Sequence, residues 1–163
     1  MKIIFLQTGG TIDKDYPKSK NGWGFEIGDS ALKNLLNKLP LSFDYKVDSI
    51  LKKDSTEIND KDLVKIYKAC ESYKEDKIII THGTDTILKT ADYLSKIKDK
   101  TIVLTGSFLP YNFKNTDADF NIGLAVAGIQ TLSHGIYVSL NGQIGKFNEF
   151  QRNEQNGRYF IHS

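Results

Sequence analysis

Short runs of apolar residues alternate along the chain with longer segments in which apolar residues recur every three or four positions. The runs predict buried strands, and the spaced segments predict amphipathic helices. The predicted strands cover residues 2–7, 43–51, 77–81, 101–105 and 135–140, and a further short edge strand is expected at 158–162. The predicted helices cover residues 30–39, 59–73, 86–97 and 117–132, with Asn59 as the N-cap of the second.

The order of these elements indicates the fold class. Strands that alternate with helices, and that are apolar at nearly every position, are typical of a parallel sheet covered on both faces. We therefore expect an α/β fold, a doubly wound three-layer sandwich with a mainly parallel, Rossmann- or flavodoxin-like sheet. The length of 163 residues suits one domain over residues 1–163. The irregular segment 13–28 is long for a loop in a compact domain, and we interpret it as a lid.

Charge and cysteine content narrow the classes of function. The 22 basic and 20 acidic residues are intermixed and leave a net charge of +2, which argues against a nucleic-acid or membrane surface. Cys70 is the one cysteine, so no disulfide within the chain is possible. Its spacing is that of a buried helix position. Neither a secretory signal nor an apolar run of the roughly 18 residues needed to span a bilayer is recognisable. We expect a cytoplasmic protein.

Glycines and hydroxyl side chains follow every predicted strand. Ligands of open α/β sheets bind outside the carboxyl ends of the strands, so these residues are candidates for a site. Part of the pattern is explained by the preference of Gly, Ser, Asp and Asn for turns. The segments that follow the five strands are Thr8-Gly9-Gly10-Thr11, Asp54-Ser55-Thr56-Glu57, His82-Gly83-Thr84-Asp85-Thr86, Gly106-Ser107 and Asn141-Gly142.

No cofactor is predicted at these turns. The glycines before Thr11 lack the third glycine of a dinucleotide fingerprint, and no Gly-Lys-Ser/Thr of a phosphate-binding loop follows them. His82 has no second His or Cys nearby, so a zinc site is not expected. A lone histidine before a glycine is more often structural than catalytic, and Asp85 could simply stabilise the start of a helix.

Two motifs identify a resemblance. TGGTI at 8–12 and THGTDT at 81–86, in this order on loops at one rim of an α/β pattern, resemble the bacterial-type L-asparaginase/glutaminase family. The likeness continues in DSTEIND at 54–60, VLTGS at 103–107 and DADFNIGLAVA at 117–127. It covers nearly the whole chain, but only the N-terminal domain of a typical family member.

The resemblance implies an amidohydrolase that cleaves the side-chain amide of L-asparagine, or of a related small amide, through a threonine acyl-enzyme. Thr11 matches the nucleophile, and Thr84 with Asp85 matches the second threonine and its aspartate, which also holds the substrate's α-amino group. Ser55 matches the serine that holds the α-carboxylate. The implied substrate-binding residues are Gly10, Ser55, Thr56, Gly83 and Asp85.

The chain departs from the family pattern at two catalytic positions. The alignment puts Phe25 where the family has a lid tyrosine, and we expect Tyr16 of the same segment to replace it. The family also pairs its second threonine with a lysine after the fifth strand. Lys146 is our candidate for this lysine, with Arg152 as the alternative, although an arginine stays protonated and cannot act as a base.

The resemblance also leads to expectations about the openness of the pocket and about self-association, and it leaves two other functions open. The second domain of the family is absent from the match, so we expect a more open pocket and weaker discrimination among amides. We expect a homo-oligomer, because the family assembles through this domain. Two other hypotheses remain: a non-catalytic domain that binds amino acids, and an amidase with a different amide substrate.

Overall fold

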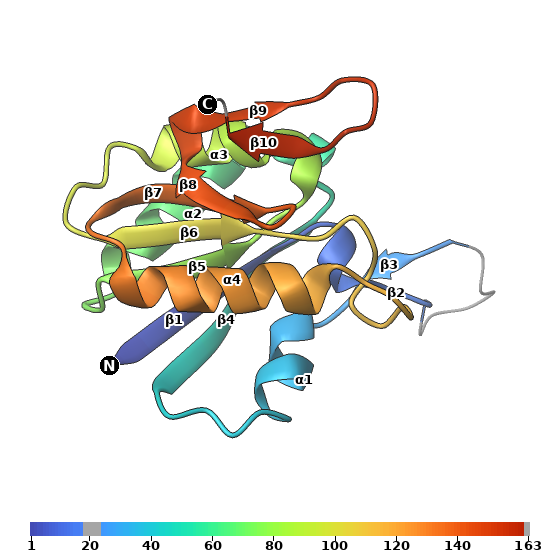
Figure 1. The fold of residues 1–163 in the computed structure, drawn as a ribbon, viewed down its shortest axis with the longest axis horizontal. Helices are drawn as coiled ribbons and strands as arrows, with labels where there is room; N and C mark the ends of the chain where they lie inside the picture. Colours follow the sequence, from blue (N-terminus) through green and yellow to red (C-terminus); the bar gives the residue numbers. More distant parts are fainter. Residues whose placement is uncertain (18–23, 162–163) are drawn as a thin grey trace.

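A six-stranded sheet organises the molecule (Figure 1). The computed structural model describes residues 1–17 and 24–161. The strands of this sheet are β1 (Lys2–Gly9), β4 (Asp44–Lys53), β5 (Lys77–Thr81), β6 (Thr101–Thr105), β7 (Gly135–Leu140) and β8 (Gln143–Lys146), in the order β4-β1-β5-β6-β7-β8. The first five are parallel and β8 is antiparallel to β7. The prediction of a mainly parallel α/β sheet is thus confirmed.

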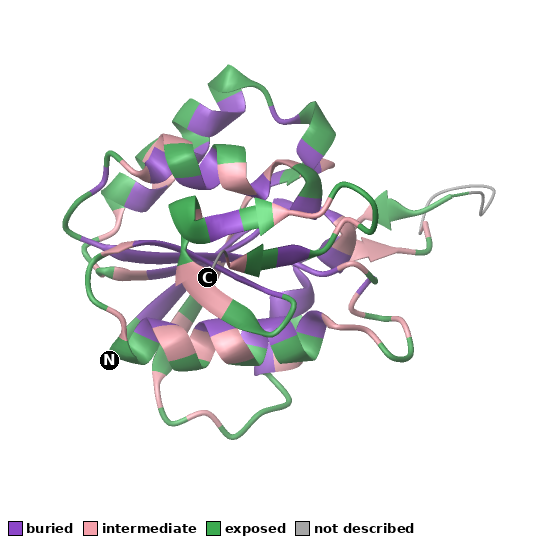
Figure 2. Ribbon diagram, turned by 45° about the horizontal axis from the view of Figure 1, so that its top comes forward, coloured by how far each residue is buried: buried purple, intermediate pink, exposed green. Residues whose placement is uncertain are grey.

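Helices cover both faces of the sheet. Helices α1 (Ala31–Leu36) and α4 (Ala118–Thr131) pack on one face, and α2 (Asp60–Ser72) and α3 (Ile87–Leu94) pack on the other. Alternate residues of each strand enter the two cores, so β5 contributes Ile79 to one and Ile78 and Ile80 to the other. Figure 2 shows the strands buried between the helices. Burial on both faces explains why the strands are apolar at nearly every position.

The helices begin where the sequence predicts, and two of them end early. Asn59 caps α2 together with Asp62 in a reciprocal capping box. The predicted helix 30–39 is α-helical only to Leu36, and 86–97 only from Ile87 to Leu94. Beyond these ends, the amides of Lys38 and Leu39 after α1, and of Ser95 and Ile97 after α3, donate to carbonyls three residues back, as in a tighter 3₁₀ turn. Cys70 is buried in α2 as expected, and burial raises the pKa of its thiol to about 12. None of the helices in the described ranges is both long and apolar enough to cross a bilayer.

The short strands are the main difference from the prediction. Strand β8 was not expected, and neither was β9 (Phe150–Arg152). The predicted edge strand 158–162 is β10 (Tyr159–Ile161), and it pairs with β9 in a separate hairpin instead of extending the main sheet. Its last predicted residue, His162, lies outside the described residues. Within the predicted lid, β2 (Lys14–Asp15) pairs with β3 (Glu26–Ile27), and residues 18–23 lie outside the described part.

A buried carboxyl group joins the turn after β1 to the start of α1. Asp13 is 3% exposed, and its Oδ1 accepts a hydrogen bond of 2.8 Å from the amide of Ala31. This bond satisfies one of the free amides at the helix N-terminus. Burial is the largest influence on the Asp13 carboxyl, and it raises the pKa to about 7. The turn that carries Thr11 is therefore tied to a helix by a group that titrates near neutrality.

This pKa predicts a pH-dependent stability. The folded state holds the proton of Asp13 more tightly than the unfolded chain, so the stabilisation is complete at low pH and is lost as the pH rises through about 7. Asp13→Asn keeps an oxygen acceptor for Ala31 and removes the titration. Between pH 5 and 6, the unfolding free energy of the wild type should fall relative to Asp13→Asn by about 1.4 kcal/mol per pH unit. Urea unfolding at several pH values measures this, and parallel curves for the two proteins would contradict the assignment.

Candidate active site

The candidate site lies where the strand order reverses. Strand β1 lies between β4 and β5, so the chain first crosses to one side of β1 and then to the other. Ligands of doubly wound sheets bind at this switch point, outside the carboxyl ends of the strands. Thr11 opens a short 3₁₀ turn directly after β1, and Thr84 opens another after β5. Because β1 and β5 are parallel neighbours, both turns stand at the same edge of the sheet.

Two glycines let three loops interlock at this edge. Gly10 has a φ of 88°, and a Cβ added to it would lie 2.3 Å from the amide nitrogen of Gly83. A Cβ added to Gly83 would lie 2.6 Å from the Cβ of Ser55 and 2.7 Å from its Oγ. No larger residue fits at either position without moving backbone. The loops after β1, β5 and β4 are thereby held together, and the two threonines immediately follow the touching glycines.

Hydrogen bonds fix the same arrangement. The amide of Gly10 donates to the carbonyl of Lys53 at 2.9 Å, next to the loop after β4. The hydroxyl of Thr86 donates to the carbonyl of Ser55 at 2.8 Å. The loop after β6 joins them, since the amide of Tyr111 donates to the carbonyl of Ile12 at 3.1 Å. Three loops, those after β4, β5 and β6, therefore support the turn that carries Thr11.

Ser55 presents a buried hydroxyl with spare bonding capacity. The residue is 1% exposed, and its Oγ has no hydrogen-bond partner among the described residues. Leaving a buried polar group unpaired costs about 1–3 kcal/mol. A ligand oxygen that accepted from this hydroxyl would recover that cost. Thr56, the neighbouring predicted ligand, is exposed, and its hydroxyl is 3.2 Å from Oδ1 of Asp54.

Arg152, and not Lys146, faces the second threonine motif. Nη2 of Arg152 lies 2.8 Å from Oδ1 of Asp85. The hairpin of β9 and β10 brings it there, and the same hairpin places Tyr159 so that its hydroxyl donates to the carbonyl of Thr84. Nothing in the short apolar run around Tyr159 marks this residue in the sequence as a contact of the site.

The structure places Lys146 away from the carboxyl edge of the sheet. The chain turns back after β7, and antiparallel pairing puts Lys146 opposite Tyr137, three residues before the end of β7. At about 3.3 Å per residue, this is about 10 Å from the carboxyl edge. Lys146 instead lines a cavity with His134 and Gly135, where β7 begins. The position of Lys146 is determined by the register of the β7–β8 hairpin, which the sequence does not reveal.

Tyr16 is placed in an aromatic cluster of the predicted lid. Its ring centroid lies 5.4 Å from that of Phe25, which in turn lies 5.3 Å from that of Phe113. Tyr16 is 68% exposed. Its catalytic role stays a prediction.

His82 has a structural environment. It is fully buried, with Nδ1 2.8 Å from the carbonyl of Gly83 and Nε2 2.8 Å from the hydroxyl of Thr90. Since a carbonyl only accepts, Nδ1 carries the proton and Nε2 accepts from Thr90. Burial lowers the pKa of His82 to about 4, so the ring is neutral at pH 7. The ring therefore holds the carbonyl of Gly83 in place. Across residues 1–17 and 24–161, no group of three or more His, Cys, Asp or Glu side chains could hold a metal ion.

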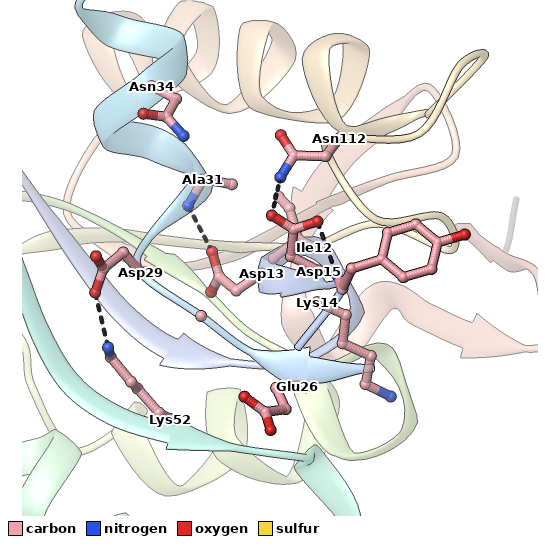
Figure 3. Close-up of a pocket in the computed structure, with 12 residues that line it drawn as sticks. Ile12, Asp13, Lys14, Asp15, Glu26, Asp29, Ala31, Asn34, Lys52 and Asn112 are labelled. Carbon is pink, nitrogen blue, oxygen red and sulfur yellow. Dashed lines mark hydrogen bonds and ion pairs between the residues drawn. The ribbon is translucent and has the colours of Figure 1, made fainter. Parts of the chain in front are cut away.

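A cavity of about 240 Å³ lies beside the Thr11 turn, between the β2–β3 hairpin and α1 (Figure 3). Its charged side chains are largely paired: Lys52 with Asp29 at 2.9 Å, and Lys14 with Asp54 of the neighbouring loop at 2.8 Å. Neither Thr11 nor Thr84 lines it. We therefore regard it as part of the support of the turn and not as the candidate site.

The glycine contact makes a testable prediction. Gly10→Ala forces a side chain into the backbone of Gly83 at a positive φ, and should lower the unfolding free energy by at least about 2 kcal/mol. The matched control is Gly123→Ala in α4, where an added Cβ meets nothing within 4 Å. This control should gain roughly 0.5–1 kcal/mol from helix propensity. Urea unfolding compares the two, and an equal effect of both changes would refute the packing argument.

Comparison with known proteins identifies the family of the chain. Residues 2–163 match the family model described as "Asparaginase, N-terminal". The chain is 38% identical over 152 residues to an L-asparaginase of Thermococcus kodakarensis, covering 88% of this chain and 45% of that protein. It is 30% identical over 154 residues to L-asparaginase 2 of Escherichia coli, covering 87% and 43%.

The solved structure of the thermostable L-asparaginase from Thermococcus kodakarensis superposes with a TM-score of 0.85 at 30% identity. The match covers 99% of this chain and 51% of that one. The chain thus spans about half the length of the relatives it matches. It belongs to the asparaginase family, and it corresponds to the family's N-terminal domain.

Proposed function

We propose that this chain carries an asparaginase-type amidohydrolase site, which hydrolyses the side-chain amide of L-asparagine or of a related small amide to the acid and ammonia. The observation that carries the proposal is the packing of Gly10, Gly83 and Ser55. It gathers a candidate nucleophile, a second threonine and an unpaired buried hydroxyl at the switch point of the sheet. Relatives named L-asparaginase and glutaminase-asparaginase support an amide as the substrate class.

The proposed reaction has two steps. The hydroxyl oxygen of Thr11 attacks the amide carbonyl, its proton passes to the leaving nitrogen, and ammonia departs from an ester on Thr11. Water then attacks the ester and restores the hydroxyl as the acid leaves. Backbone amides of the glycine turns are suited to the oxyanion, and loss of one such donor costs about 3–4 kcal/mol in comparable sites. Ser55 would hold the substrate's carboxylate.

A second candidate function follows from Arg152. The guanidinium beside Asp85 stays protonated and so cannot take a proton from Thr84 or Thr11. A domain that binds a small amino acid without turnover would keep the same contacts. Aspartate at a hundredfold its dissociation constant would then stabilise the chain by about 2.7 kcal/mol while no ammonia formed. A cytoplasmic location and a homo-oligomer remain predictions that accompany either function.

Replacing the two threonines tests the hydrolytic proposal. With L-asparagine and a panel of small amides, Thr11→Ala should lower the release of ammonia at least about a thousandfold, because the ester can no longer form. Thr84→Val, which keeps the shape and removes the hydroxyl, should lower it by about a hundredfold or more. The control is Thr131→Ala at the exposed end of α4, which should leave the rate unchanged.

A coupled ammonia assay gives these rates, and circular dichroism verifies that each variant folds. If the wild type releases ammonia from one of the amides and neither Thr11→Ala nor Thr84→Val slows it, the mechanism is wrong. If no amide yields ammonia while aspartate raises the unfolding temperature, the binding function replaces it.

A further inference from the structure

One oxygen atom of the buried Asp13 carboxyl group has unused bonding capacity. The residue is 3% exposed, and its Oδ1 accepts from the amide of Ala31 at 2.8 Å. Its Oδ2 has no hydrogen-bond partner among the described residues. Figure 3 shows this carboxyl group among the side chains that line the cavity beside the Thr11 turn. A buried polar atom of this kind is stabilised when a proton or a ligand pairs with it.

The wall of this cavity has more carboxyl groups than cations. Its charged residues are four acids and two lysines, namely Asp13, Asp15, Glu26, Asp29, Lys14 and Lys52. Both lysines are already engaged. Lys52 contacts Asp29 at 2.9 Å, and Lys14 lies 2.8 Å from Asp54, which is outside the wall. The charge of the wall therefore favours a cation as the ligand.

Asp15 contributes a carboxylate whose hydrogen bonds do not neutralise it. Its Oδ1 accepts from the amide of Tyr16 at 2.8 Å, and its Oδ2 accepts from Nδ2 of Asn112 at 2.7 Å. Both donors are uncharged, so they orient the carboxylate and leave its negative charge in place. Ile12 and Ala31, which are buried, add apolar surface to the wall. A cation with N–H donors and a short apolar group matches this combination.

We propose that this cavity binds a short primary alkylammonium ion, with the carboxylate of Asp13 as its counter-ion. The ammonium group would donate to Oδ2 of Asp13, and the alkyl group would lie against Ile12 and Ala31. The volume of about 240 Å³ exceeds the roughly 30 Å³ that one water molecule occupies in the liquid, so a ligand of a few heavy atoms fits. The inference goes beyond the proposed hydrolytic function and does not depend on it.

Binding of the ammonium ion displaces a proton from Asp13. Burial raises the pKa of this carboxyl to about 7, although the side chains of Gln7 and Lys52 lower it in part. The other charged groups of the wall are Lys14 and Asp15 of β2, Glu26 of β3 and Asp29 before α1. The positive charge of the ligand stabilises the ionised carboxylate. Below pH 7, each ammonium ion that binds therefore releases a proton from the carboxyl group to the solvent.

Titration calorimetry with methylammonium chloride tests the site. For the wild type, the dissociation constant should fall about tenfold from pH 6 to pH 8. Buffers that differ in ionisation enthalpy should show the release of nearly one proton per ligand at pH 6. Asp13→Asn should weaken binding at pH 8 by about tenfold or more and abolish the proton release, because the amide is uncharged. Asp92→Asn is the matched control, since it removes an exposed carboxylate of α3 away from the cavity, and it should bind as the wild type does.

Tetramethylammonium chloride distinguishes the proposed site from a general effect of salt, because this ion has the charge but no N–H donor. It should bind at least about tenfold more weakly than methylammonium. Equal binding of the two ions, equal binding to the wild type and Asp13→Asn, or no saturable binding of methylammonium to the wild type would overturn the inference. If Asp13→Asn fails to fold, the wild type decides, since an affinity that is the same at pH 6 and pH 8 also overturns it.

Discussion

The backbone contact between Gly10 and Gly83 is the constraint on which the candidate site depends. Where these two residues touch, the loops after β1 and β5 approach more closely than side chains would permit. Ser55 fills the space on the far side of Gly83 and adds the loop after β4. The parallel sheet provides the common edge, and the missing side chains at two positions let the three loops that carry Thr11, Thr84 and Ser55 pack together.

The hairpin of β9 and β10 adds a positively charged side chain, that of Arg152, to the carboxyl edge of the sheet. Through Tyr159 it contacts the backbone of Thr84, and through Arg152 it contacts the side chain of Asp85. The two contacts act on neighbouring residues of one turn, so the hairpin both positions the turn and sets its charge. An arginine there brings donors and a permanent positive charge, whereas a lysine can also exchange a proton. The chemistry at this edge therefore depends on one residue of a short strand.

The sequence predicted the parts of the molecule that local patterns determine. The isoleucine-rich strands are buried on both faces, and Asn59 caps its helix, because both features depend on neighbouring residues. The carboxyl-edge motifs containing Thr11 and Thr84 could be found for the same reason. Lys146 could not be placed, because its position depends on the register of the β7–β8 hairpin. The hydrogen bond from the amide of Ala31 to Asp13 could not be predicted either, because it joins residues 18 positions apart through a tertiary contact.

The proposed site requires that the threonines of the two motifs face one ligand. A crystal structure of the chain with L-aspartate or succinate bound would reveal whether they do. We expect the ligand's side-chain carboxylate to lie within roughly 3–3.5 Å of the hydroxyl oxygens of both Thr11 and Thr84. The ligand's other carboxylate is expected to accept from the hydroxyl of Ser55. A ligand bound away from the switch point, or threonine hydroxyls that point to opposite sides of the edge, would contradict it.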